Sequence, residues 1–248
     1  MTRCNRTQVK QGFSLLEVLL SVAILSVVVG GIFEQMNLVV QRQATERFKV
    51  DDMQEARDFV DQFFRDINEV GYPNSRMIDT TAAWNPALAV PLINDNRVAV
   101  GLVKIDANEI RFEADTNGDG NVQSVVYMLN GSGACPVCLQ RSQVAKASGA
   151  NPLTGQTPNW GTEVNDVVNA NPIFTYYDSS ANQIAVPADI NANPTTIAKV
   201  KTVKISLVIR NNNVRDFKTG LPIETNFEGE VSLNNCSMAA TGQAMSCQ

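Results

Sequence analysis

Residues 13–33 form a nearly continuous hydrophobic run in which Glu17 is the only ionisable residue. About twenty such residues are enough for a helix to cross a hydrocarbon core of roughly 30 Å. From residue 34 onward the continuous run gives way to apolar positions spaced three to four residues apart among charged ones, which is typical of an amphipathic helix. These positions are Met53, Ala56, Val60, Phe63, Phe64 and Ile67.

The two patterns belong to one predicted helix. No proline occurs between Phe13 and Val70, while Gly71 and Pro73 are helix stop signals. The sequence therefore predicts a single helix over 13–70, transmembrane over 13–33 and amphipathic over 34–70.

The segment before this helix, residues 1–12, contains three basic side chains and no acidic one. By the positive-inside rule this end stays in the cytoplasm, and the rest of the chain is exported. A secretory signal peptide would end in a small-residue cleavage site, but Glu-Gln-Met-Asn-Leu follows Phe33. An uncleaved signal anchor remains an open alternative.

Glu17 is unusual because a carboxylate inside an apolar span costs a few kcal/mol unless a partner compensates for its desolvation. No Lys or Arg lies within 13–33. The partner must therefore come from another chain or from a new chain end. Cleavage after Gly12 would create one, the amino group of Phe13.

The sequence Gly12-Phe13-Ser14-Leu15-Leu16-Glu17, after a short basic leader and before an apolar helix, resembles the type IV prepilin motif. The resemblance implies cleavage between Gly12 and Phe13 by a prepilin peptidase, N-methylation of Phe13, and docking of Glu17 against the N-terminus of a neighbouring subunit. A buried carboxylate facing a buried ammonium group would fix the register between subunits.

The end of the predicted helix, residues 58–72, is similar to that of PilW-like minor pilins at Arg65, Asp66, Gly71 and Tyr72. Residues 109–120 and 125–127 add a strand, turn and strand also common in that group. This resemblance implies a minor pilin that helps to initiate or assemble a pilus, near its tip. Minor pseudopilins of type II secretion have a similar layout, and a membrane-tethered adhesive or binding module is a further alternative.

The same resemblance implies partners and a location. The partners are other major and minor pilins, the inner-membrane assembly platform and a tip adhesin. The protein is expected to cross the bacterial inner membrane once, with its head in the periplasm, and then to enter an extracellular pilus.

Residues 71–248 are predicted to form a β-rich head on the amphipathic half of the helix, an α+β arrangement with one antiparallel sheet. Strand-like composition covers 97–103, 109–114, 122–129, 173–177, 200–210 and 227–233. Residues 140–170, which include Trp160, are rich in Gly, Asn, Pro and Thr and are predicted to be a loop insertion, either decorative or a partner surface.

Composition excludes several functions. The net charge is −5, and removal of residues 1–12 leaves 17 basic against 25 acidic side chains, so net charge does not favour nucleic-acid binding. The chain contains no histidine, the commonest general base and metal ligand. We therefore expect a protein without enzymatic activity.

The Asp115-Thr-Asn117-Gly-Asp119-Gly loop presents oxygen ligands at alternate positions, as in the first half of an EF-hand. Weak Ca²⁺ binding is the only cofactor prediction. The bidentate Glu of an EF-hand is replaced by Val126. We favour a tight hairpin turn in which Asn and Gly adopt positive φ and Asp side chains accept hydrogen bonds from local amides.

Cys4 lies in the predicted leader, so four cysteines remain in the exported part: Cys135, Cys138, Cys236 and Cys247. An even number in an exported domain favours disulfides. Three pairings are possible, and we favour Cys135 with Cys138 and Cys236 with Cys247 because short loops close readily. A zinc site or a CxxC redox site is an alternative, although neither finds its usual sequence context here.

Overall fold

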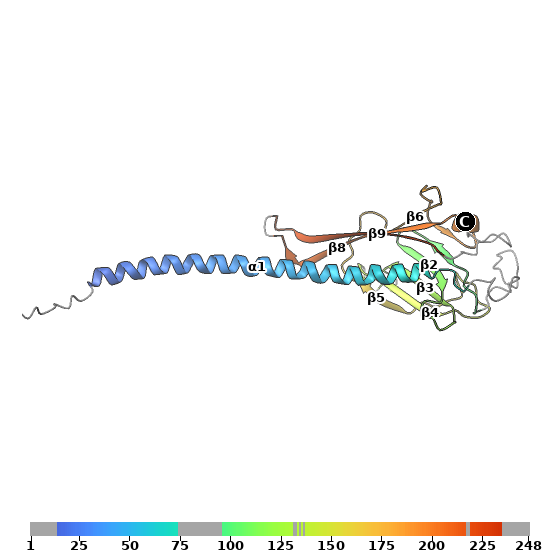
Figure 1. Cartoon of the computed structure of the whole chain (residues 1–248), viewed down its shortest axis with the longest axis horizontal. Coiled ribbons are helices and arrows are strands. Elements are labelled where there is room, and N and C mark those ends of the chain that lie inside the picture. Colours follow the sequence, from blue (N-terminus) through green and yellow to red (C-terminus); the bar gives the residue numbers. More distant parts are fainter. Residues whose placement is uncertain are drawn as a thin grey trace, which may run out of the picture.

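A long helix and two antiparallel sheets make up the structure, a computed structural model that describes residues 14–73, 96–130, 133, 135, 137–216 and 219–234. Helix α1 spans Leu15–Asn68. Its N-terminal half projects away from the head, and its C-terminal half lies among the strands (Figure 1). The predicted α+β architecture, a long helix on antiparallel strands, is confirmed.

The end of α1 follows the predicted stop signals. Glu69 is the C-cap residue, and Gly71 adopts a φ of 79°, a left-handed conformation that glycine reaches without a Cβ clash. The Gly71 N–H then donates to the carbonyl of Glu113, 3.0 Å away. The turn that ends the helix is thus bonded directly to the head.

One sheet has six strands in the order β5-β4-β3-β2-β1-β7, and the other has three in the order β6-β8-β9. The strands of the first sheet are β1 Leu102–Ile105, β2 Glu109–Ala114, β3 Gln123–Leu129, β4 Leu139–Ala145, β5 Trp160–Val164 and β7 Ala188–Asp189. Those of the second are β6 Phe174–Tyr177, β8 Thr202–Arg215 and β9 Pro222–Ser232, and a short helix α3, Pro194–Ala198, precedes β8. The single sheet that we expected is therefore divided in two.

The C-terminal half of α1 lies between the two sheets in Figure 1 and contributes one face to the core. The buried apolar residues of that face are Ala56, Phe59, Phe63 and Ile67, and Val70, just after the helix, is buried with them. Phe63 makes an edge contact with Tyr127 of β3 and a stacked contact with Phe174 of β6. Because one aromatic ring touches both sheets, burial of this face holds the head together around the helix.

The prediction of a loop insertion over 140–170 is wrong, because β4 and β5 occupy much of it. The irregular parts are 146–159 and 165–170. The first lies against the six-stranded sheet, where Leu153 accepts a hydrogen bond from Arg111 at 2.6 Å. The polar residues Gln140 and Ser142 of β4 are buried, and Ser142 accepts a hydrogen bond from the Asn159 N–H of this loop at 2.8 Å. On the other face Arg141 reaches α1.

The strand predicted over 97–103 begins later, at Leu102. Residues Val98–Val100 are buried but do not pair with a neighbouring strand. Two side chains bind their backbone instead: Glu113 accepts from the Val100 N–H at 3.0 Å, and Lys146 donates to the Val98 carbonyl at 2.8 Å. A third bond to this backbone joins the Ala99 N–H to the carbonyl of Pro73 at 2.9 Å, so the run is held in place without strand pairing.

Candidate membrane-anchoring and assembly segment

Glu17 lies in the first turn of α1 and is exposed. Its neighbours Leu15, Leu16 and Val18 are 78%, 76% and 49% exposed. Among the described residues, no ion pair involves Glu17. The carboxylate is therefore presented on an apolar surface, with no cationic partner from the described part of its own chain.

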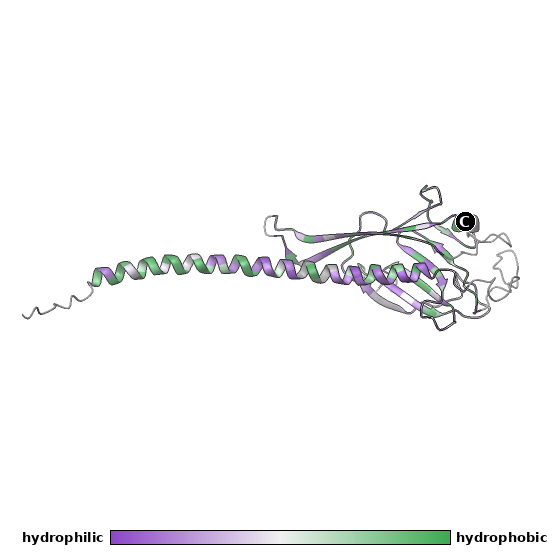
Figure 2. Ribbon diagram, viewed as in Figure 1, coloured by the Kyte–Doolittle hydropathy of each residue, from purple (hydrophilic) through white to green (hydrophobic). Residues whose placement is uncertain are grey.

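Around Glu17, α1 has the length and composition of a membrane span. The segment Leu15–Ala44 has 30 residues, a mean hydropathy of 2.5 in its most apolar part, and no burial inside the head. Figure 2 shows hydrophobic residues predominating in this half of the helix. It is the only helix in the described part of the chain that meets these criteria.

The hydroxyl groups of two serines in this segment donate hydrogen bonds to carbonyl groups of the same helix. Ser21 donates to the carbonyl of Val18 at 2.9 Å, and Ser26 donates to that of Val22 at 2.8 Å. Such bonds leave no hydroxyl hydrogen unpaired in an apolar environment. The serines are thus compatible with lipid contact, and Glu17 is the residue that needs a partner from outside.

The first residues of the chain also match a known family. Residues 8–33 match the family model of the prokaryotic N-terminal methylation motif. The match includes Gly12, Phe13 and Glu17 and supports a type IV pilin-like prepilin, a structural subunit of the pilin or pseudopilin type that is anchored in a membrane. No curated protein and no solved structure matches the chain.

The methylation motif is only partly covered by the structure. Gly12 and Phe13, the predicted cleavage and methylation sites, lie outside the described residues, whereas Glu17 lies within them. Cleavage, methylation and the docking role of Glu17 therefore stay predictions.

At the opposite end of α1, an ionic cluster joins the helix to the six-stranded sheet. Asp66 is 1% exposed, and its Oδ2 accepts hydrogen bonds from Tyr127 Oη at 2.6 Å and from Nε and Nη2 of Arg141 at 2.9 and 2.7 Å. Its Oδ1 accepts from Gln62 at 2.6 Å. The desolvated carboxylate is thus fully compensated by donors from α1, β3 and β4.

The surroundings of Asp66 also influence two other groups. Burial raises the pKa of Tyr127 well above its usual value, and the charge of Asp66 adds to the effect, so the phenol keeps the proton that it donates. Half-buried Glu163 of β5 has a raised pKa, mainly because of burial, with Arg141 opposing the change. Asp66 was singled out from the sequence, but its partners Tyr127 and Arg141 were not.

A second buried ion pair, Glu113 with Lys146, was also missed. Both side chains are fully buried, and the Lys146 Nζ lies 2.7 Å from Glu113 Oε2. Burial raises the pKa of Glu113, and the adjacent Lys146 limits that rise. Nothing in the local sequence distinguishes Lys146 from a surface lysine at the end of a strand, because its partner lies 33 positions away.

The Asp115–Gly120 turn belongs to the hairpin loop 115–122 between β2 and β3, which is longer than the tight turn that we expected. Asp115 accepts hydrogen bonds from the N–H groups of Asp119 and Gly120 at 3.2 and 2.9 Å, as we expected. Gly118 and Gly120 adopt positive φ, but Asn117 does not. No group of three or more acidic or cysteine side chains suited to a metal occurs among the described residues, and calcium binding by Asp115, Asn117 and Asp119 stays a prediction.

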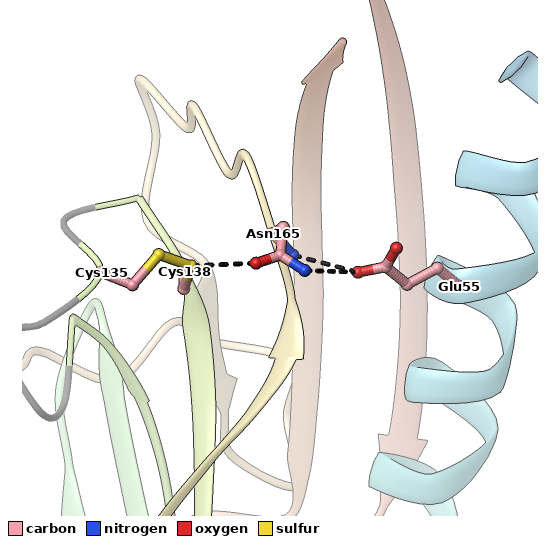
Figure 3. Close-up of a disulfide and its surroundings, with 4 residues drawn as sticks. All are labelled: Glu55, Cys135, Cys138 and Asn165. Atoms are coloured by element: carbon pink, nitrogen blue, oxygen red, sulfur yellow. Dashed lines mark hydrogen bonds between the residues drawn. A yellow bond between two sulfur atoms is a disulfide. The ribbon is translucent and has the colours of Figure 1, made fainter.

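The disulfide Cys135–Cys138 is present, with its Cα atoms 5.4 Å apart, whereas Cys236 and Cys247 lie outside the described residues. Figure 3 shows its surroundings: the Cys138 sulfur contacts Asn165 Oδ1 at 3.3 Å, and the backbone N–H of Asn165 donates to Glu55 of α1 at 3.1 Å. The turn closed by the Cys135–Cys138 disulfide thus lies near the point where α1 enters the head.

Proposed function

We propose that the protein is a minor type IV pilin, most similar to the PilW-like group, that helps to initiate or assemble the pilus near its tip. The methylation motif over 8–33 supports a pilin or pseudopilin type of subunit. The similarity at Arg65, Asp66, Gly71 and Tyr72 favours the minor pilins. A minor pseudopilin of type II secretion is the alternative within the same class.

The observation that carries this proposal is the exposed Glu17 on an apolar helix. Its carboxylate needs a cation, and cleavage between Gly12 and Phe13 would place an ammonium group at the N-terminus of each subunit. In staggered helices, Glu17 of one subunit would face the methylated Phe13 of the next, in a low-dielectric setting where the attraction is stronger than at a surface. Such a pair would favour one register among subunits.

The proposed partners and orientation follow from the same chemistry. A prepilin peptidase would process residues 1–12, and the assembly platform and other pilins would receive the mature helix. The basic leader would stay in the cytoplasm and the head would enter the periplasm. Neither nucleic acid nor catalysis has a role in this proposal.

The test is replacement of Glu17 by Val, with Glu34→Gln as a matched control that removes another carboxylate of α1. Glu17→Val should insert into the membrane at least as well as wild type, because an apolar residue replaces a charged one. Its recovery in sheared filaments should fall about tenfold or more, which corresponds to the loss of a buried ionic contact.

Glu34→Gln should be recovered in filaments at the wild-type level. Equal recovery of the wild type and Glu17→Val, with membrane levels matched, would contradict the docking role. A chain that enters filaments only when secretion pseudopilins are expressed would instead identify the alternative system.

A further inference from the structure

A polar pocket of about 390 Å³ lies at the end of the head that is remote from the membrane-anchoring half of α1. Its wall includes Asn96, Asn117, Asp119, Gln123 and Gln143. The adjoining turn is bonded to the C-terminal end of α1, where the Asp115 N–H donates to the carbonyl of Tyr72 at 2.9 Å. The N-terminal half of α1 leaves the head at the other end (Figure 1).

One side of the pocket is held rigid by its own hydrogen bonds. Asn117 Oδ1 accepts from Gln123 at 2.8 Å, and Asn117 Nδ2 donates to Asp119 Oδ2 at 2.8 Å. Gln123 Oε1 in turn accepts from the Thr116 N–H at 2.9 Å. These bonds fix the side chains before any ligand arrives, which reduces the entropy lost on binding.

The other side offers groups without a hydrogen-bond partner among the described residues. The side chains of Asn96 and Gln143 make no hydrogen bond in the described part of the chain, although both line the pocket. Each amide carries donors and an acceptor close together. A ligand in the pocket would therefore meet fixed polar groups on one wall and unused amides on the other.

The charge and shape of this wall restrict the class of ligand. Among the described residues that line the pocket, Asp119 is the one acidic side chain. Hydrogen bonds from the Asn121 N–H and the Asn117 side chain lower its pKa, so it is ionised and disfavours anions. The Lys146 ammonium group is bound to Glu113 instead. None of the lining residues that the structure describes is aromatic, and the apolar ones are the small Val122 and Ala145. Large apolar side chains of a peptide would find little to contact.

We propose that this pocket binds a neutral glycan, through hydrogen bonds between sugar hydroxyls and the amides of Asn96 and Gln143. A hydroxyl group donates and accepts, and therefore matches an amide that does both. The volume lies at the lower end of the range for small-ligand sites, which fits a terminal sugar unit. This inference is independent of the filament role, because the pocket shares no residue with Glu17 or the methylation motif.

The experiment uses the full chain in a detergent without sugar groups. Its binding is measured on an array of methyl glycosides of glucose, galactose, mannose, N-acetylglucosamine and N-acetylgalactosamine, with sialic acid as the anionic comparison and EDTA in every buffer. The best neutral glycoside is then titrated calorimetrically. Gln143→Ala and Asn96→Ala should each weaken its binding by about two- to tenfold, the usual effect of losing one uncharged hydrogen bond.

Asn212→Ala is the matched control, because it removes an exposed amide of β8 that does not line the pocket. It should bind like the wild type, and all three variants should enter filaments normally. Absence of binding to every neutral glycoside in these EDTA-containing buffers, equal binding by Gln143→Ala, Asn96→Ala and wild type, or preference for sialic acid would each overturn the proposal.

Discussion

At the scale of single residues, Asp66 is the group on which the attachment of α1 to the six-stranded sheet depends. A buried carboxylate is stabilising only when its lost hydration is replaced, and three side chains do this here: Tyr127, Arg141 and Gln62. These donors come from α1, β3 and β4. The cluster therefore specifies how the helix is placed on the sheet.

Replacing Tyr127 by Phe tests this cluster with the smallest change of shape. The variant keeps the ring contacts with Phe59 and Phe63. It removes the hydrogen bond that the phenol donates to buried Asp66 and the one that it accepts from Arg141 Nε. We expect the free energy of unfolding to fall by about 1.5–3 kcal/mol. Urea unfolding of the full chain in detergent micelles, followed by near-UV circular dichroism, measures the change.

The matched control is Tyr177→Phe, on β6, whose hydroxyl makes no hydrogen bond in the described part of the chain. Its unfolding midpoint should stay close to that of the wild type. Similar losses in the two variants would mean that the Asp66 cluster contributes nothing specific.

The sequence analysis identified Asp66 but did not predict its partners in this cluster. Asp66 was identified because, together with Gly71 and Tyr72, it belongs to the helix end that is similar to that of PilW-like minor pilins. Arg141 lies 75 positions away, in a strand whose polar residues made it look like a loop. Which residues pair over such a distance depends on how the sheet packs on the helix. The local sequence pattern therefore does not predict the pair.

At the scale of elements, α1 was predictable almost to its ends, because apolar spacing, absence of proline and a glycine stop signal all act within a few residues. β2 was predicted with its observed bounds, and β3, β6, β8 and β9 were found with shifted ends. β4 was missed because its polar residues Gln140 and Ser142 are buried, and β5 because it is short and mostly polar. The methylation motif, a local feature, was recognised for the same reason that α1 was.

The contact between α1 and β9 requires a glycine at one position. A Cβ built on Gly229 would lie 2.5 Å from Cζ of Phe64. Gly229→Ala should therefore displace a ring that packs against the core and lower the free energy of unfolding by about 1–3 kcal/mol. In a Phe64→Leu background the same substitution should cost little, because the obstructing ring is gone.

Gly161→Ala serves as the control for this cycle. It is also a strand glycine, but its added Cβ would meet only the Arg141 carbonyl oxygen at 3.8 Å, an ordinary contact. Its unfolding midpoint should not fall. A loss for Gly229→Ala that persists unchanged in the Phe64→Leu background would contradict the steric explanation.

At the scale of the whole molecule, the chain combines a self-sufficient head with a half-helix that cannot be stable in water alone. The head buries its apolar residues between two sheets and α1, whereas exposed apolar side chains run along α1 from Leu15 to Val40. A continuous surface of this kind requires lipid or neighbouring helices. A filament subunit is surrounded first by lipid, in the membrane, and then by neighbouring helices, in the pilus.

The most direct test of the pilin account is mass spectrometry of the N-terminal peptide, on protein recovered from membranes of cells that make filaments. The account predicts a chain that begins at Phe13 and carries one N-methyl group. Recovery of the chain with Met1 and residues 2–12 still attached, from cells whose other pilins are processed, would contradict it.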